Sequence, residues 1–228
     1  MFFNRTALKG IKMHKGIFVT ATDTEAGKTY VSCKIAEILE KSGINTGVFK
    51  PVSTGDRNDA KVLIKAAKID ETPETVTPVF FKNPMPPYGA SLLERRASDR
   101  IFDLKKINDA FKYFLNKYEF TVVEEVGGIL VPLKQNFFVS DLIKKFNLPV
   151  IVVARFGLGT LNHTLLTVEK SKRDRQKILG VILSGKKNNN DVSVKSNASI
   201  IKRITKLSVL ELGYNEKIDL EKNRWIIK

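Results

Sequence analysis

Gly27, Lys28 and Thr29 are the residues of this sequence whose types and order most directly suggest chemistry. Backbone amides near such a glycine can surround phosphate oxygens, while the Lys28 ammonium reaches the terminal phosphates and the Thr29 hydroxyl joins Mg²⁺. The usual phosphate-binding motif is G-x-x-x-x-G-K-[ST], and Thr22 stands where its first glycine belongs. A three-residue match also occurs by chance, so the flanking segments decide the interpretation.

Those flanking segments have the order that a phosphate-binding loop requires. An apolar run from residue 16 to residue 19 enters the polar turn, and residues 30–41 carry apolar side chains at helical spacing. A strand, a loop and a helix in this order predict that the loop amides and the positive helix end face an anion.

Charged residues also stand at the predicted ends of other strands. Lys50 follows the run 45–49 and precedes a proline, and Glu124 ends the apolar run 120–124. Parallel sheets bind ligands at the carboxyl ends of their strands, so both side chains are expected in the crevice, with Glu124 as a Mg²⁺ carboxylate. Asp59 opens a helix, and glycines at 127 and 128 let the backbone turn closely past a ligand. Each charge could also be simply solvated, and Asp59 could be only a helix cap.

Alternation of strands and helices continues along the chain. The sequence predicts one α/β domain at 15–228, a P-loop NTPase-like parallel sheet with helices on both faces. Residues 1–14 are expected to be a disordered extension or an upstream start artefact. The other predicted strands are 149–153, 178–184 and 207–210, and the helices are 59–67, 89–97, 103–118, 141–146, one from 160, and 199–206.

Composition limits the classes of function. The net charge is +15, from 39 Lys and Arg against 24 Asp and Glu, which suits nucleic acid or anionic small substrates. The lysines are spread over helix faces without a basic stripe, so no nucleic acid is expected. A single cysteine, no run of about 20 apolar residues and no targeting signal predict a soluble cytoplasmic protein without a membrane partner.

Four blocks resemble the dethiobiotin synthetases, in the order and spacing of that family from about residue 15 onward. They are 22–29, 50–55, Glu124 with Gly127, Gly128 and Pro132, and 157–167. The second and fourth are the more specific. The resemblance implies an ATP- and Mg²⁺-dependent cyclo-ligase of biotin synthesis, which joins 7,8-diaminononanoate and CO₂ to give dethiobiotin, ADP and phosphate. It also implies a homodimer.

Roles follow from the same resemblance. Lys50 and Lys28 are expected to be catalytic, and Thr29, Asp59 and Glu124 to hold Mg²⁺. Thr24, Thr54, Leu158 and Gly159 match substrate-binding positions, the last two at a turn that receives the substrate carboxylate from the neighbouring subunit's site. The nucleotide-binding positions are Glu25, Ala26, Gly27, Lys28, Thr29, Tyr30, Asp59, Glu124, Gly127 and Ser184.

The sequence departs from the family pattern at several places. Ala21 and Glu125 stand where the family usually has glycine. A negative charge at Glu125 could repel phosphate unless the side chain turns outward or Mg²⁺ neutralises the charge. Ser184 replaces an asparagine that binds adenine, and Gly213-Tyr214 replaces an Ile-Pro turn near the base. Weaker discrimination among nucleoside triphosphates is therefore expected. The alternatives are another P-loop ATPase or amide-forming synthetase, a nucleotide-switched nucleic-acid binder, and a degenerate member that binds nucleotide without turnover.

Overall fold

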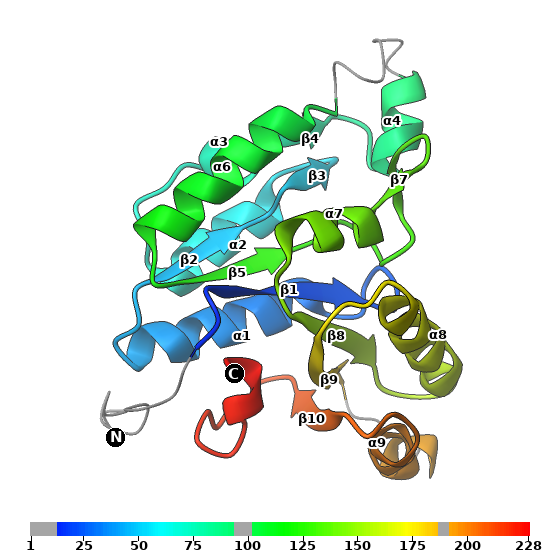
Figure 1. Ribbon diagram of the computed structural model, residues 1–228. Coiled ribbons are helices and arrows are strands. Elements are labelled where there is room, and N and C mark those ends of the chain that lie inside the picture. The colour runs from blue at the N-terminus through cyan, green and yellow to red at the C-terminus, as the bar shows by residue number, and fades with distance from the viewer. Residues whose placement is uncertain (1–12, 94–101, 187–191) are drawn as a thin grey trace.

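A six-stranded parallel sheet forms the centre of the protein (Figure 1), whose computed structural model describes residues 13–93, 102–186 and 192–228. The strand order is β10-β9-β8-β1-β5-β2, and β1 pairs with β5 on one side and β8 on the other. The strands that follow β1 are added first on its β5 side and later on its β8 side, so the strand order reverses at β1. In parallel sheets the ligand-binding crevice lies at the carboxyl ends of the strands at such a reversal. The strands are β1 (Gly16–Ala21), β2 (Thr46–Phe49), β5 (Phe120–Glu124), β8 (Val150–Arg155), β9 (Ile178–Gly185) and β10 (Ser208–Gly213).

Helices cover both faces of this sheet, as predicted. On one face α1 packs against α2, and on the other lie α6, α7 and α8, with α9 beside α8 (Figure 1). The central strands are buried on both sides and therefore read as continuous apolar runs. The helices are α1 (Lys28–Lys41), α2 (Asn58–Ala67), α3 (Pro73–Val76), α4 (Pro87–Leu93), α6 (Leu104–Lys117), α7 (Val139–Phe146), α8 (Thr160–Arg173), α9 (Val192–Thr205) and the 3₁₀ turn η2 (Arg224–Ile226).

Aromatic rings fill the space between the sheet and helices α6 and α7. The Phe111 and Phe146 rings stack with centroids 3.8 Å apart, and the Phe49 ring lies 5.2 Å from that of Phe114. The apolar stripe predicted for residues 103–118 is therefore core. The predicted cap is also confirmed, because Asp103 Oδ1 accepts a hydrogen bond from Lys106 N at 2.9 Å.

Two predicted helices differ from the structure. The helix predicted at 199–206 begins at Val192, because a buried stripe of Val194, Asn197 and Ile201 extends it towards the amino end. The helix predicted at 89–97 corresponds to α4, and its residues after 93 lie outside the described part of the chain.

Smaller elements complete the structure. Two short two-stranded sheets, β3-β4 and β6-β7, were not predicted. Their strands are β3 (Val52–Thr54), β4 (Val79–Phe81), β6 (Pro132–Lys134) and β7 (Phe137–Phe138). Of the predicted extension 1–14, residues 1–12 lie outside the description, and His14 N donates to Ile227 O at 3.2 Å.

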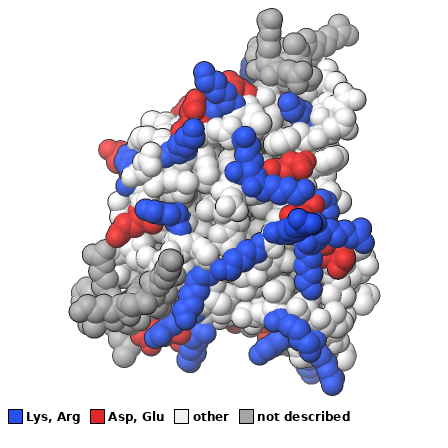
Figure 2. Space-filling view, in the orientation of Figure 1, with Lys and Arg blue, Asp and Glu red and all other residues white. Residues whose placement is uncertain are grey.

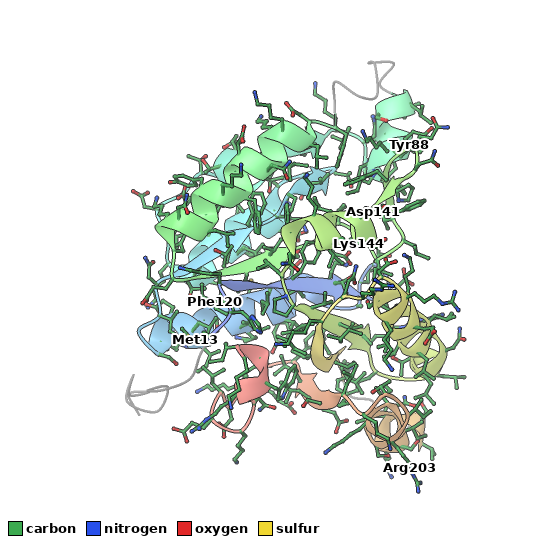
Figure 3. The ribbon with its side chains drawn as sticks, viewed as in Figure 1. Met13, Tyr88, Phe120, Asp141, Lys144 and Arg203 are labelled. Carbon is green, nitrogen blue, oxygen red and sulfur yellow. The ribbon has the colours of Figure 1, made fainter. Side chains whose placement is uncertain are left out.

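Lys and Arg side chains are distributed over the face formed by α6, α7, α8 and α9, with fewer Asp and Glu among them (Figure 2). Some are paired, as on α7, where Lys144 Nζ lies 3.8 Å from Asp141 and 3.0 Å from Asp174 (Figure 3). Within the described residues, no helix is long and apolar enough to cross a membrane.

Candidate active site

The loop between β1 and α1 has the backbone of an anion-binding turn. Glu25 and Gly27 have φ angles of 60° and 90°, so two residues close together take the left-handed conformation. Gly27 is the N-cap of α1, and a Cβ at this position would lie 2.9 Å from Ser184 Oγ. Successive amides of such a turn, added to the free amides of a helix start, make a concave site for phosphate.

Lys28 and Thr29 leave this turn towards β5. The Lys28 side chain is largely buried, and its Nζ donates to Gly127 O at 2.5 Å. Thr29 Oγ1 lies 2.9 Å from Glu124 Oε1 and 3.1 Å from Asp59 Oδ1, so its single hydroxyl hydrogen is shared between two carboxylates. The structure therefore brings the phosphate-binding loop, α2 and the end of β5 together, as the sequence predicts.

Lys50 is the charged centre of this cluster. Its Nζ lies 2.7 Å from Glu124 Oε1 and 2.8 Å from Asp59 Oδ2, and it also donates to Glu125 O at 3.3 Å. Burial opposes the ammonium charge, but attraction to Glu124 and Asp59 outweighs burial and raises the pKa of Lys50. Burial acts against the Asp59 carboxylate too, yet Lys50 lowers the pKa of Asp59.

Glu124 has an oxygen that its neighbours leave unused. The residue is completely buried, and its Oε2 has no hydrogen-bond partner among the described residues. A buried carboxylate oxygen without a partner is costly, so it needs a cation or a donor that binds in the crevice.

A mostly apolar groove of about 360 Å³ opens beside the loop. Thr24 lines it and Thr54 does not, since Thr54 lies half-buried at the end of β3. The lining consists of Thr22, Asp23, Thr24, residues 128–132, His163, Leu166, Thr167 and Lys170. The groove was not predicted, because His163 and Lys170 come from α8 and only the fold brings them to this loop.

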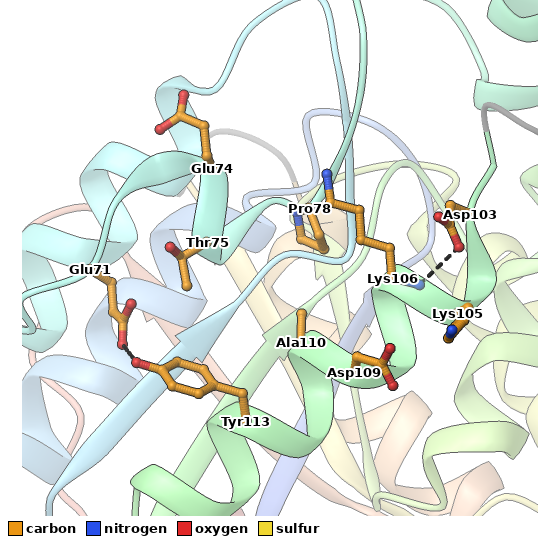
Figure 4. A pocket seen from close by; sticks show the side chains of 10 residues that line it. All are labelled: Glu71, Glu74, Thr75, Pro78, Asp103, Lys105, Lys106, Asp109, Ala110 and Tyr113. Carbon is orange, nitrogen blue, oxygen red and sulfur yellow. Dashed lines mark hydrogen bonds between the residues drawn. The ribbon is translucent and has the colours of Figure 1, made fainter.

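A wider hollow of about 660 Å³ lies between α3 and α6, apart from the predicted site residues (Figure 4). Among its side chains, Glu71 accepts a hydrogen bond from Tyr113 Oη at 2.8 Å, and Asp103 caps α6. Its described lining includes none of the predicted site residues. The predicted catalytic and nucleotide-binding residues lie instead near the carboxyl ends of β1 and β5.

The predicted carboxylate-binding turn opens α8. Gly157 and Gly159 have φ angles of 98° and 87°, which favour glycine, and Leu158 between them is 85% exposed. Gly159 is the N-cap of α8 and has no side chain to fill the helix start.

Comparisons with known proteins agree with this geometry. The model of the AAA domain family matches residues 15–221. An ATP-dependent dethiobiotin synthetase of Endomicrobium trichonymphae is 93% identical over 216 residues, which are 95% of this chain and 100% of that protein. The chain belongs to the dethiobiotin synthetase family. It is thus an ATP-dependent ligase of biotin biosynthesis.

More distant dethiobiotin synthetases match as well. The enzyme of Bacillus licheniformis is 38% identical over 213 residues, which cover 90% of this chain and 87% of that enzyme. The enzyme of Methanocaldococcus jannaschii is 43% identical over 168 residues, with coverages of 74% and 78%. Similarity to relatives this distant confirms the family interpretation of the sequence.

Glu125 does not turn outward in this synthetase. It is 2% exposed beneath the loop, and its Oε1 accepts a hydrogen bond from Ala21 N at 2.8 Å. Burial raises the pKa of Glu125 to about 8, although Lys28 and the Ala21 amide act in the opposite direction. A carboxyl whose pKa is raised in this way carries less negative charge near neutral pH, which weakens the expected repulsion of phosphate.

The residues predicted to lie near the nucleotide base are short or aromatic. Ser184 is the last residue but one of β9 and is 1% exposed. Tyr30 Oη donates to Gly213 O at 3.1 Å, and its ring meets that of Tyr214 edge to face at 5.6 Å. The structure thus brings Tyr30 and Gly213-Tyr214 together, and β10 pairs Leu212 with Ser184 beside them.

Proposed function

We propose that this synthetase carboxylates 7,8-diaminononanoate with CO₂ and closes the ureido ring at the cluster of Lys50, Glu124, Asp59 and Thr29. The observation that carries the proposal is the Lys50 ammonium, held 2.7 Å and 2.8 Å from two carboxylates next to a phosphate-binding loop. A buried, fixed positive charge is what a reaction through carbamate and phosphoryl anions requires.

The donor set of this cluster fits Mg²⁺. Thr29 supplies a hydroxyl oxygen, and Asp59 and Glu124 supply carboxylate oxygens, which are the ligand types that Mg²⁺ prefers. The unpartnered, buried Oε2 of Glu124 gives such an ion a place to bind. When bound, Mg²⁺ would neutralise charge on the β- and γ-phosphates of ATP.

Protein residues then act mainly by holding and neutralising anions. An amine of the substrate takes up CO₂ and loses a proton to form a carbamate, whose oxygen attacks the γ-phosphorus while ADP leaves. The second amine attacks the carbonyl carbon of this phosphorylated carbamate, loses a proton and expels phosphate, which closes the ring. Lys28 faces the transferring phosphoryl group, and Lys50 stabilises the carbamate and phosphoryl oxygens.

Residues 25–30, with Gly127 and Ser184, hold the nucleotide, whose base lies towards Tyr30. The diamine lies in the groove beside Thr24, where apolar walls suit its alkyl chain. Thr54, which lies outside the groove at the end of β3, contacts the part of the substrate that extends beyond it. The carboxylate of the diamine substrate binds to the Leu158-Gly159 turn and the start of α8 of a second subunit.

The synthetase acts as a cytoplasmic homodimer in this proposal. Leu130 and Leu166 line the groove with 54% and 62% of their surface exposed, and Leu158 is 85% exposed. Apolar side chains exposed around one groove are typical of an interface.

Phosphate release from ATP and Mg²⁺ tests the proposed reaction. We expect release only when 7,8-diaminononanoate and bicarbonate are both present, with dethiobiotin formed in equal amount by mass spectrometry. Each co-substrate is omitted in turn as the control. ATP hydrolysis that proceeds equally without the diamine would contradict the proposal.

Base discrimination is expected to be weak. Ser184 offers one short hydroxyl, whereas the longer asparagine amide would present a donor and an acceptor on separate atoms and could pair with adenine in a bidentate way. We expect kcat/KM for ATP, CTP and GTP to agree within about tenfold, and Ser184→Asn to raise the preference for ATP by about tenfold or more. Steady-state rates with each triphosphate measure this, and a strong ATP preference in the unmodified enzyme would contradict it.

A further inference from the structure

Asn197 is a buried polar side chain that the reaction itself does not use. It lies in the middle of α9, is 3% exposed, and shares the buried stripe of that helix with Val194 and Ile201. Its Nδ2 donates to Gly157 O at 3.0 Å, so it joins α9 to the turn before α8. A buried amide at an otherwise apolar position is costly unless its hydrogen bonds are specific.

The turn that receives this bond has little to fix it from within. Gly157 and Gly159 both take left-handed φ angles, and Leu158 projects into solvent. The Gly157 carbonyl also accepts from Thr160 N, at a longer distance of 3.4 Å. Glycines restrict the backbone least of all residues, so an outside contact is needed to hold one conformation.

We propose that Asn197 is a positioning residue that fixes the Gly157–Gly159 turn, and thereby the start of α8, for the substrate carboxylate. This inference rests on the proposed function, in which that turn receives the carboxylate. Asn197 touches no reacting atom and acts through the Gly157 carbonyl. Its effect falls on substrate binding and leaves phosphoryl transfer unchanged.

Two substitutions separate the hydrogen bond from packing. Asn197→Leu keeps the number and branching of side-chain heavy atoms and removes the donor, and Asn197→Asp places an acceptor against the Gly157 carbonyl. The matched control is Ser199→Asp, which adds the same charge to an exposed position of the same helix. Thermal unfolding establishes that each variant is folded.

We expect both Asn197 variants to raise KM for 7,8-diaminononanoate about tenfold, the value of one hydrogen bond, with kcat and KM for ATP unchanged. The KM of the corresponding diamine without a carboxylate should not change. Hydrogen exchange should become faster in residues 156–163 and stay as before in the loop 22–29. The control should match the unmodified enzyme in every measurement.

The results that would overturn the proposal differ from those against the proposed reaction. Unchanged exchange in residues 156–163 would mean that Asn197 does not position the turn. Faster exchange with an unchanged KM for 7,8-diaminononanoate would mean that the turn does not bind the carboxylate. An equal rise in KM for 7,8-diaminononanoate and for the diamine without a carboxylate would mean the same. Absence of dethiobiotin from the unmodified enzyme would instead contradict the proposed reaction.

Discussion

Lys50→Ala should lower kcat for dethiobiotin formation by about 10²- to 10³-fold, the usual effect of removing one preorganised charge from a transition state. Lys50 is 3% exposed and its ammonium is held by Glu124 and Asp59, so the substitution removes a fixed charge that a neutral water molecule cannot replace. KM for ATP should change little, because Lys28 and the loop amides remain. Steady-state and single-turnover rates measure both quantities.

The same substitution has a second, structural consequence. It leaves the buried Glu124 without its cation, and removing one partner of a buried pair costs about 3–5 kcal/mol in other proteins. Unfolding by urea should therefore be compared at 25 °C before activity is interpreted. Lys41→Ala, at the exposed end of α1, is the matched control and should alter neither rate nor stability. Activity within about threefold of the unmodified enzyme would exclude a catalytic role for Lys50.

Much of this cluster could be predicted because it depends on chain order alone. Lys50 and Glu124 each follow an apolar run, and parallel strands bring such residues to one edge of the sheet. In the structure Lys50 Nζ donates directly to Glu124 Oε1 at 2.7 Å, and Thr29 Oγ1 lies 2.9 Å from the same oxygen. Their roles in the reaction remain proposals.

Other features could not be predicted because they depend on packing between distant segments. The orientation of Glu125 is set by the Ala21 amide on a neighbouring strand. Asn197 was missed because its helix was predicted to begin at Ser199. Serines and an asparagine interrupt the apolar pattern of residues 192–198, so this segment was not predicted as helix. The groove beside Thr24 needs α8 to lie over the 128–132 segment.

Glu125→Gln should change how stability depends on pH. The folded protein holds the Glu125 proton up to a pKa of about 8, against 4.5 for an ordinary glutamate, so unfolding releases a proton between these values. The contribution of this proton to the free energy of unfolding is fully present below about pH 4.5, decreases as the pH rises, and is lost by about pH 8. Over this range the loss is on the order of several kcal/mol. Glutamine is always neutral and can still accept from Ala21 N, so the variant should lack this loss.

The free energy of unfolding at pH 5.5, 7.0 and 8.5 measures this effect, in EDTA and without nucleotide so that no ligand contributes. The difference between Glu125→Gln and the unmodified protein should grow steadily with pH in favour of the variant. Glu211→Gln, on the exposed side of β10, is the matched control and should follow the unmodified protein at each pH. A constant difference across the three pH values would mean that Glu125 is already charged in the fold. The charge beneath the phosphate-binding loop would then have to be balanced by Lys28 rather than by a proton.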